Sequence, residues 1–254
     1  MISFKKLHQE EEPLLLGNVW NVQSAKVYQK SGYKALATSS SAVAMSLGYE
    51  DGEQMSFEEY FYMIKRIKAS VSIPLSVDLE GGYGNTSEIV VSNIIKLLDI
   101  GIAGINLEDT CMADGERQLV DRNVFLEKLS DILTLLKEKR GEVFINIRTD
   151  PFLLGMENAL EETLERIKLF EKLNVDGIFV PGIINIEDIK TVVEATSLPV
   201  NVMCLPDLPD FETLKLSGVK RITSGAFLNR HIYSELERIS DTITNNKSFA
   251  ALFI

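Results

Sequence analysis

The chain has 254 residues, 45% of them hydrophobic, and its 37 acidic against 26 basic side chains give a formal net charge of −11. Such a surface repels phosphate backbones and anionic lipid, so neither nucleic acid nor a membrane is expected as a partner. The two cysteines, Cys111 and Cys204, are too few and too far apart for a disulfide framework. With no apolar run long enough to cross a membrane, a cytoplasmic protein is expected.

Apolar runs of strand length recur along the chain, with helical segments between them. They are expected as strands near Leu14–Asn18, Lys34–Thr38, Ile73–Asp78, Ala103–Leu107, Val143–Arg148, Gly177–Pro181, Pro199–Met203 and Val219–Thr223. The segments between them have apolar residues at helical spacing, as at Leu160, Leu164 and Ile167. Repeated strand–helix units of this number are typical of a (β/α)8 TIM barrel. We therefore predict an α/β fold with a single barrel domain over residues 1–254.

Two acids end the third predicted strand, and glycines follow them at once. Residues i and i+2 of a strand point to the same side, so Asp78 and Glu80 are expected to converge. Like charges on one strand face repel each other unless a cation lies between them. Glu108 follows the next predicted strand, and the carboxyl ends of barrel strands meet at one rim. Because these ligands are all hard oxygen atoms, a site for Mg2+ or Mn2+ is predicted there.

Other polar residues after the predicted strands leave two interpretations open. Arg148 suits a bidentate clamp on a carboxylate or phosphonate, or a salt bridge to a neighbouring acid. The hydroxyl-rich run at residues 38–41 suits an anionic ligand, or is an ordinary polar turn. Asp109 and Asp150 are either parts of the site or helix caps and turn formers. Neither His8, in the N-terminal segment, nor His231, in the expected last helix, is well placed as a general base, so carboxylates, the arginine and hydroxyls are expected to carry the chemistry.

The segment Thr110–Val120 follows the strand that ends near Glu108, and such loops over barrel mouths act as lids. Two charged residues in it are candidates for contact with the reacting groups. Glu116 would serve as an acid, and Arg117 as an electrostatic partner of the substrate. The alternative is a solvated turn, because Gly115 with flanking charges is ordinary loop composition.

Over nearly its whole length the chain resembles the isocitrate lyase and phosphoenolpyruvate mutase superfamily. The matching segments are Gly17–Ala25, Ala37–Ser41, Leu47–Gly52, Val77–Gly84, Gly104–Asp109, Ile147–Asp150, Gly177–Gly182 and Val200–Met203. The resemblance implies a barrel whose C-terminal helix, near residues 226–245 here, is exchanged between the subunits of a homotetramer or homodimer. It also implies an Mg2+-dependent enzyme that cleaves or forms a C–C or P–C bond next to a 2-oxo acid, through a pyruvate-like enolate.

The resemblance assigns roles to residues of this chain, position by position. The metal would be held, mostly through water, by Asp78, Glu80 and Glu108. The substrate would be bound by Arg148, Ser39, Ser40, Ser41 and Asn201. Asp51 would lie near the metal and, with Arg148 and the lid residue Glu116, complete the candidate catalytic set. If the C-terminal helix instead packs on its own barrel, no helix exchange between subunits is expected.

The chain departs from the best-defined lid sequences of the superfamily. The lyases carry Lys-Lys/Arg-Cys-Gly-His with the cysteine as general acid, whereas that place falls near Glu116 here and Cys111 comes too early. The mutase pattern of a Lys followed by Thr-Asn-Ser is also missing, and the usual Asp-x-Asp ends in Glu80. The substrate is therefore left as a small 2-oxo or 2-hydroxy dicarboxylate or a phosphonate. The alternatives are a phosphoenolpyruvate mutase, a phosphonopyruvate hydrolase, and a non-catalytic oxo-acid-binding relative.

Overall fold

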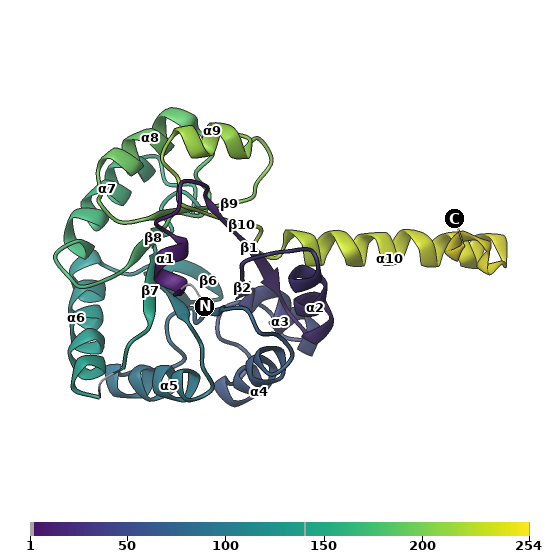
Figure 1. The fold of residues 1–254 in the computed structure, drawn as a ribbon, viewed down its shortest axis with the longest axis horizontal. Helices are drawn as coiled ribbons and strands as arrows, with labels where there is room; N and C mark the ends of the chain where they lie inside the picture. The colour runs from purple at the N-terminus through teal and green to yellow at the C-terminus, as the bar shows by residue number, and fades with distance from the viewer. Residues whose placement is uncertain (1–2, 140, 254) are drawn as a thin grey trace.

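The computed structural model describes residues 3–139 and 141–253, and it confirms the predicted barrel. Parallel strands close into a ring in the order β1-β10-β9-β8-β7-β4-β3-β2, with helices around it (Figure 1). The barrel strands are β1 (Leu14–Val19), β2 (Ala35–Thr38), β3 (Leu75–Asp78), β4 (Gly104–Glu108), β7 (Phe144–Arg148), β8 (Gly177–Phe179), β9 (Val200–Met203) and β10 (Arg221–Thr223). Each apolar run expected from the sequence forms one of these strands, with small differences at its ends.

The helices that cover the barrel bury one apolar face, and all of them except α7 begin at a side-chain cap. They are α2 (Val22–Lys30), α3 (Ser40–Leu47), α4 (Phe57–Lys68), α5 (Ser87–Asp99), α6 (Arg122–Glu138), α7 (Ala159–Phe170), α8 (Ile186–Glu194) and α9 (Phe211–Leu216). At α4, Ser56 and Glu59 form a capping box in which each side chain accepts from the other's backbone N–H. The buried helix faces pack with apolar strand residues in one large cluster, which holds the helices on the ring.

A short N-terminal helix, α1 (Phe4–Leu7), closes one end of the barrel. Phe4 and Leu7 pack in a second apolar cluster with side chains of β1, β2 and β7, and α1 lies across the centre of the ring (Figure 1). His8 follows and stacks on Phe144, with ring centroids 4.2 Å apart. The open end of the barrel is therefore the opposite one, at the carboxyl ends of the strands.

The segment predicted as a lid is an antiparallel hairpin, β5 (Thr110–Ala113) and β6 (Glu116–Leu119), called here the lid hairpin. Asp114 and Gly115 join its strands, and both have positive φ, 53° and 81°. This is the backbone of a type I′ turn, for which Asp-Gly is a favoured pair. Side chains alternate along a strand, so neighbouring residues of β6 face opposite sides.

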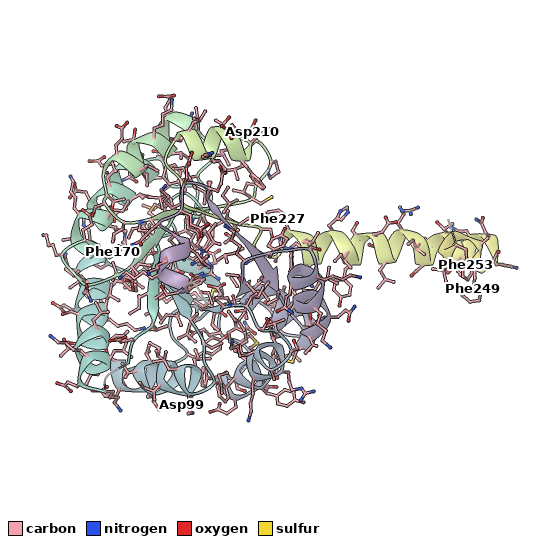
Figure 2. The ribbon with its side chains drawn as sticks, viewed as in Figure 1. Asp99, Phe170, Asp210, Phe227, Phe249 and Phe253 are labelled. Carbon is pink, nitrogen blue, oxygen red and sulfur yellow. The ribbon has the colours of Figure 1, made fainter. Side chains whose placement is uncertain are left out.

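The C-terminal helix α10 (Phe227–Asn246) covers the range where a tail helix was expected, and a short 3-10 helix (Phe249–Leu252) follows it. α10 extends away from the ring, with Phe227 beside the barrel and Phe249 and Phe253 at the far end (Figures 1 and 2). Among the residues that the structure describes, no helix is long and apolar enough to cross a membrane.

Candidate active site

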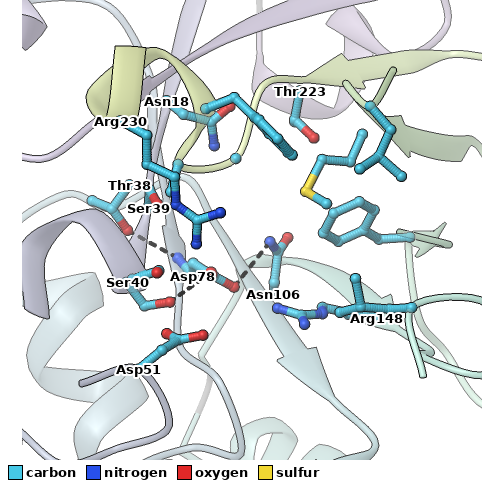
Figure 3. Close-up of a pocket in the computed structure, with 18 of the residues that line it drawn as sticks. Asn18, Thr38, Ser39, Ser40, Asp51, Asp78, Asn106, Arg148, Thr223 and Arg230 are labelled. Carbon is cyan, nitrogen blue, oxygen red and sulfur yellow. Dashed lines mark hydrogen bonds between the residues drawn. The ribbon is translucent and has the colours of Figure 1, made fainter. Parts of the chain in front are cut away.

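A cavity of about 250 Å³ lies at the carboxyl ends of the barrel strands (Figure 3). Of the residues proposed from the sequence, it is lined by Ser39, Ser40, Ser41, Asp51, Asp78 and Arg148. A second cavity, of about 340 Å³, has Glu80, Glu108 and Arg117 in its lining. The structure thus divides the predicted site between two cavities, which we call the arginine cavity and the lid cavity.

The serine run lies where β2 passes into α3. Ser39 caps this helix, because its Oγ accepts a hydrogen bond from the backbone N–H of Ala42 at 3.3 Å. Ser40 Oγ donates to Asp78 Oδ2 at 2.9 Å. Since all three serines line the arginine cavity, the N-terminus of α3 faces it, and a helix N-terminus favours negative charge. The run is therefore both a structural turn and a place suited to an anion.

Asp78 is half-buried near the centre of the arginine cavity (Figure 3). Its Oδ1 accepts a hydrogen bond from Asn106 Nδ2 at 3.3 Å, and Ser40 occupies Oδ2. Burial raises the pKa of the Asp78 carboxyl, a shift that Arg148 opposes and Glu108 increases. The carboxylate is fixed in place, and its charge is only partly compensated.

Arg148, at the end of β7, is held by neighbouring acids. Its Nε and Nη2 donate to the two carboxylate oxygens of Asp150, each at 2.7 Å. Its Nη1 lies 2.9 Å from Glu108 Oε2. The salt bridge that the sequence left as an alternative is thus present, and it fixes the guanidinium in the wall of the arginine cavity.

A buried network behind Arg148 positions Asp150. The backbone N–H of Asp150 donates to Asp109 Oδ1 at 3.1 Å, and Thr149 Oγ1 donates to Asp109 Oδ2 at 2.5 Å. Arg166 Nη1 also donates to Asp109 Oδ2, at 3.0 Å. Burial raises the pKa of Asp109, and Arg166 lowers it. Asp109 therefore supports the site from behind, rather than capping a helix or lining a cavity.

The three predicted metal ligands do not form a direct coordination shell. In residues 3–139 and 141–253, no group of three or more His, Cys, Asp or Glu side chains is arranged to hold a metal ion. The expected convergence of Asp78 and Glu80 fails because β3 ends at Asp78, and Glu80 has a left-handed backbone with φ 50°. Strand alternation does not continue through such a residue. The Glu80 carboxylate instead accepts from Tyr83 OH at 2.7 Å and from the Glu53 backbone N–H at 3.0 Å.

The acids around the two cavities nevertheless fit a divalent cation chemically. Burial raises the pKa of Glu80 to about 8, and repulsion from Asp51 and Glu108 adds to this shift. Asp51 Oδ1 is buried with no hydrogen-bond partner among the described residues, and Glu108 Oε2, although close to Arg148, is outside hydrogen-bond geometry. Hard oxygen donors with unrelieved repulsion suit Mg2+ or Mn2+. Without a direct shell, such an ion would be held largely through water.

Arg117 of the lid hairpin lies between two of these acids. Its Nη2 donates to Asp51 Oδ2 at 3.0 Å, and its Nη1 contacts Glu108 Oε1. Glu116 is exposed on the other face of β6, because neighbouring strand residues point in opposite directions. The prediction that Glu116 reaches the site is therefore corrected: the lid residue that does so is Arg117.

Asn201 lies beneath the arginine cavity and is absent from its lining. It is completely buried, and its Oδ1 accepts from Asn146 Nδ2 at 3.3 Å while its Nδ2 donates to Val202 O at 2.7 Å. These contacts place it in a polar layer inside the barrel. A role in substrate binding would therefore be indirect.

Two arginines in the lining of the arginine cavity were missed by the sequence reasoning. Arg221 begins β10 and is 1% exposed. Arg230, in the first turns of α10, lies at the cavity near Ser39 (Figure 3) and packs over the Phe227 ring at 5.8 Å. Two adjacent charged residues, Lys220 and Arg221, within the predicted strand 219–223 were the available signal for Arg221. Nothing in the sequence marked Arg230.

The loop that carries Asp51 packs tightly on the lid hairpin. Gly52 has φ 100°, and a Cβ at this position would lie 2.6 Å from Met112 Cγ in β5. A glycine is required both by this backbone and by this approach. The Asp51 loop and the lid hairpin are therefore in direct contact.

A (β/α)8 barrel with a fixed arginine, a helix N-terminus and acids at the carboxyl ends of its strands has the features of an enzyme active site. The profile of the phosphoenolpyruvate phosphomutase family matches residues 4–244, and the chain belongs to this family. The superfamily expected from the motifs is thereby confirmed.

Three similar proteins illustrate the range of this family. A crystal structure of a Burkholderia cenocepacia protein, provisionally named a phosphonomutase, has a TM-score of 0.87 and 34% identity, covering 94% of this chain and 97% of its own. An uncharacterized protein of Mycobacterium tuberculosis is 28% identical over 89% of this chain and 82% of its own length. The oxaloacetate decarboxylase of a Marinomonas species is 24% identical, over 82% of this chain and 72% of its own length.

Proposed function

We propose that the chain is a Mg2+- or Mn2+-dependent lyase-type enzyme that cleaves or forms a C–C or P–C bond next to a 2-oxo acid. The observation that carries this proposal is the arginine cavity, where Arg148, the α3 N-terminus and Asp78 line one small space. Cationic and backbone donors there suit the carboxylate of an oxo acid, and the acids suit a metal. The similarity to an oxaloacetate decarboxylase favours a C4 2-oxo diacid as substrate.

The roles of the residues follow from their contacts. Arg148, fixed by Asp150, binds a carboxylate or phosphonate through its free N–H groups. Ser39 and the first amides of α3 orient the carboxylate beside the 2-oxo group. The metal would be held by Asp51, Asp78, Glu80 and Glu108. When bound, it supplies Lewis acidity toward the 2-oxo oxygen, where enolate charge develops.

Arg117 is proposed to close the site. In the structure Arg117 reaches from the lid hairpin to Asp51 and Glu108, and it covers Glu108, whose side chain is 4% exposed. Low water content strengthens every electrostatic contact with a bound anion. Arg117 thereby takes the electrostatic role considered for the lid, whereas Glu116 is absent from the lining of both cavities.

Phosphonate chemistry is the second candidate, because the provisionally named phosphonomutase is 34% identical to this chain. Arg148 and the α3 N-terminus suit a phosphonate as well as a carboxylate. A phosphoenolpyruvate mutase and a phosphonopyruvate hydrolase would both use this cavity. They are separated by their products, phosphoenolpyruvate or inorganic phosphate.

The test is a screen for pyruvate release from C4 to C7 2-oxo and 2-hydroxy acids and from phosphonopyruvate, with Mg2+ and with EDTA. Turnover is expected only with the metal, and Arg148→Lys is expected to remove it. Lys190→Gln is the matched control, because Lys190 pairs with Glu187 on an exposed helix face. Binding of pyruvate without turnover of any acid would identify a non-catalytic oxo-acid-binding protein.

We also propose that α10 is exchanged between subunits of a homodimer or homotetramer. Of its described side chains only Asn229 is buried, whereas Leu228, Ile232 and Leu236 form a stripe that is 39%, 46% and 55% exposed. An apolar stripe on a helix that leaves its own barrel is unfavourable in water. A second copy of the chain would cover it.

We also propose a cytoplasmic location, because the cysteines are few and no apolar run is long enough to cross a membrane. We propose a single domain, because the strand–helix units form one barrel.

A further inference from the structure

Arg221 crosses the interior of the barrel below Asp78. It starts β10, and its Nη2 donates at 3.2 Å to Oδ1 of Asn106 in β4, the strand opposite β10 in the ring. The amide of the same Asn106 donates to Asp78. The guanidinium therefore lies under the centre of the arginine cavity and forms part of its lining.

The charge of Arg221 has no ionic partner in the part of the chain that the structure describes. Its Nε and Nη1 have no hydrogen-bond partner among those residues, although the side chain is 1% exposed. Burial lowers the pKa of Arg221 to about 9, and Asp78 opposes this shift. An unpaired buried cation is strongly unfavourable. Arg221 is therefore a poor choice for a purely structural role, because a neutral side chain would pack there without the free-energy cost of burying an unpaired charge.

A second arginine in the lining of the arginine cavity, Arg230, also lacks an ionic partner among the described side chains. Arg230, Asn18 and Thr223 lie across the cavity from Arg148 (Figure 3). This agrees with the topology, since β10 and β1 are neighbours and β7 is opposite β1. Arg148 is already paired with Asp150, whereas Arg230 forms no ion pair with the described side chains. The unpaired charges are therefore those of Arg221, under the centre of the cavity, and of Arg230, in the wall near β10, whereas the charge of Arg148 is paired.

We propose that Arg221, assisted by Arg230, forms a second anion subsite that binds the distal carboxylate of a dicarboxylic ligand. The 2-oxo acid end would lie at Arg148 and the α3 N-terminus, so this inference rests on the proposed function for the position of that end. A carboxylate that reaches the floor of the cavity would supply acceptors for the N–H donors of Arg221 that lack a partner. The subsite would make the protein select diacids over monoacids of the same chain length.

Calorimetry with two matched ligand pairs tests this selection. 2-Oxoglutarate is compared with 2-oxopentanoate, and succinate with butyrate, since each pair differs by the distal carboxylate. The wild type is expected to bind the diacid of at least one pair about tenfold or more tighter than its monoacid. In Arg221→Met this preference is expected to vanish through weaker diacid binding, with monoacid binding unchanged. A wild type with no diacid preference in either pair, or an Arg221→Met variant that keeps it, overturns the proposal.

A structural role for Arg221 makes a different prediction. If the residue only tied β10 to β4 through Asn106, Arg221→Met would lower the Tm of the unliganded protein and weaken both members of a pair equally. The subsite instead predicts an equal or higher Tm, because an unpaired buried charge is removed. Arg238→Gln, on the exposed part of α10, is the control and is expected to leave binding unchanged.

Arg230→Gln carries the test if Arg221→Met does not fold, because Arg230 is exposed. Its diacid preference is expected to fall at least about threefold, and an unchanged preference overturns the proposal. Binding is measured without turnover, so the two proposals fail separately. Absence of activity on every acid removes the proposed function alone, whereas turnover without a diacid preference removes the subsite alone.

Discussion

Replacing Arg117 by alanine is expected to strengthen Mg2+ binding. The Arg117 guanidinium lies between Asp51 and Glu108, which are two of the acids proposed to hold the metal. A guanidinium and a divalent ion compete for the same oxygen atoms, because both are cations that need them. Without the guanidinium, Mg2+ binds these carboxylates without first displacing another cation, so its binding free energy is more favourable.

The size of the effect follows from the contacts. Two opposite charges about 4 Å apart attract by about 4 kcal/mol at an effective dielectric constant of about 20. The Arg117–Asp51 distance is 3.0 Å, but the two side chains are 17% and 41% exposed, so solvent screens much of the attraction. We expect a net effect of about 1.4 kcal/mol, which is a Kd for Mg2+ about tenfold tighter.

Titration calorimetry with Mg2+, repeated with Mn2+, measures this change. Glu116→Gln is the matched control, because Glu116 is the neighbouring lid residue with an exposed side chain; its Kd is expected to stay within about twofold of wild type. An unchanged or weaker affinity in Arg117→Ala would refute the competition. On a substrate that is turned over, Arg117→Ala should also lower kcat/KM at least about tenfold, because the acids lose their cover.

Three further predictions concern Asp78, His8 at the end of the barrel that α1 closes, and the helix α10. Asp78→Ala is expected to abolish turnover and weaken Mg2+ binding at least about tenfold, with an unchanged circular-dichroism spectrum. Burial lowers the pKa of His8 to about 3, so the unfolded chain takes up a proton before the folded one. Stability is therefore lost as pH falls below about 6.5, by about 2 kcal/mol at about pH 5 in urea unfolding. Light scattering is expected to give an oligomer of the 28.4 kDa chain.

Each of these has a distinct contrary outcome. Equal Mg2+ affinity in wild type and Asp78→Ala would show that the metal site is misplaced. The His8→Phe variant keeps an aromatic ring against Phe144 but cannot titrate, so a pH dependence identical to wild type would exclude His8 as its source. A monomer at micromolar concentration would rule out the exchange of α10.

The barrel was predictable because its strands are covered on both sides. Strands such as β4 and β9 have no exposed residue and are mostly apolar, so they are recognisable between amphipathic helices. The course of α10 was not predictable in the same way. An apolar stripe is the same in sequence whether a helix packs on its own barrel or extends from it, and the structure alone selects the extended arrangement.

The parts of the candidate site that lie at strand ends were found, and those that depend on local backbone were not. Asp78 and Arg148 end their strands, where barrel topology brings residues together. Glu80 does not point to the same side as Asp78, because its positive φ breaks the two-residue period of the strand. Glu116 does not face the site, because the register of the hairpin decides which of two neighbouring residues points inward. Arg221 escaped notice because inward positions of barrel strands usually hold core side chains.

The contact of Gly52 with Met112 couples the two loops that bring charge to the site. Asp51 is next to Gly52, and Met112 pairs with Arg117 across the lid hairpin, so displacing one loop displaces the other. Asp78 and Arg148 belong to strands and stay where they are. One half of the site is therefore held by strands, and the other half depends on the contact between the two loops. A side chain at position 52 would push the Asp51 loop and the lid hairpin apart, so Asp51 and Arg117 would move away from Glu108, which is held in β4.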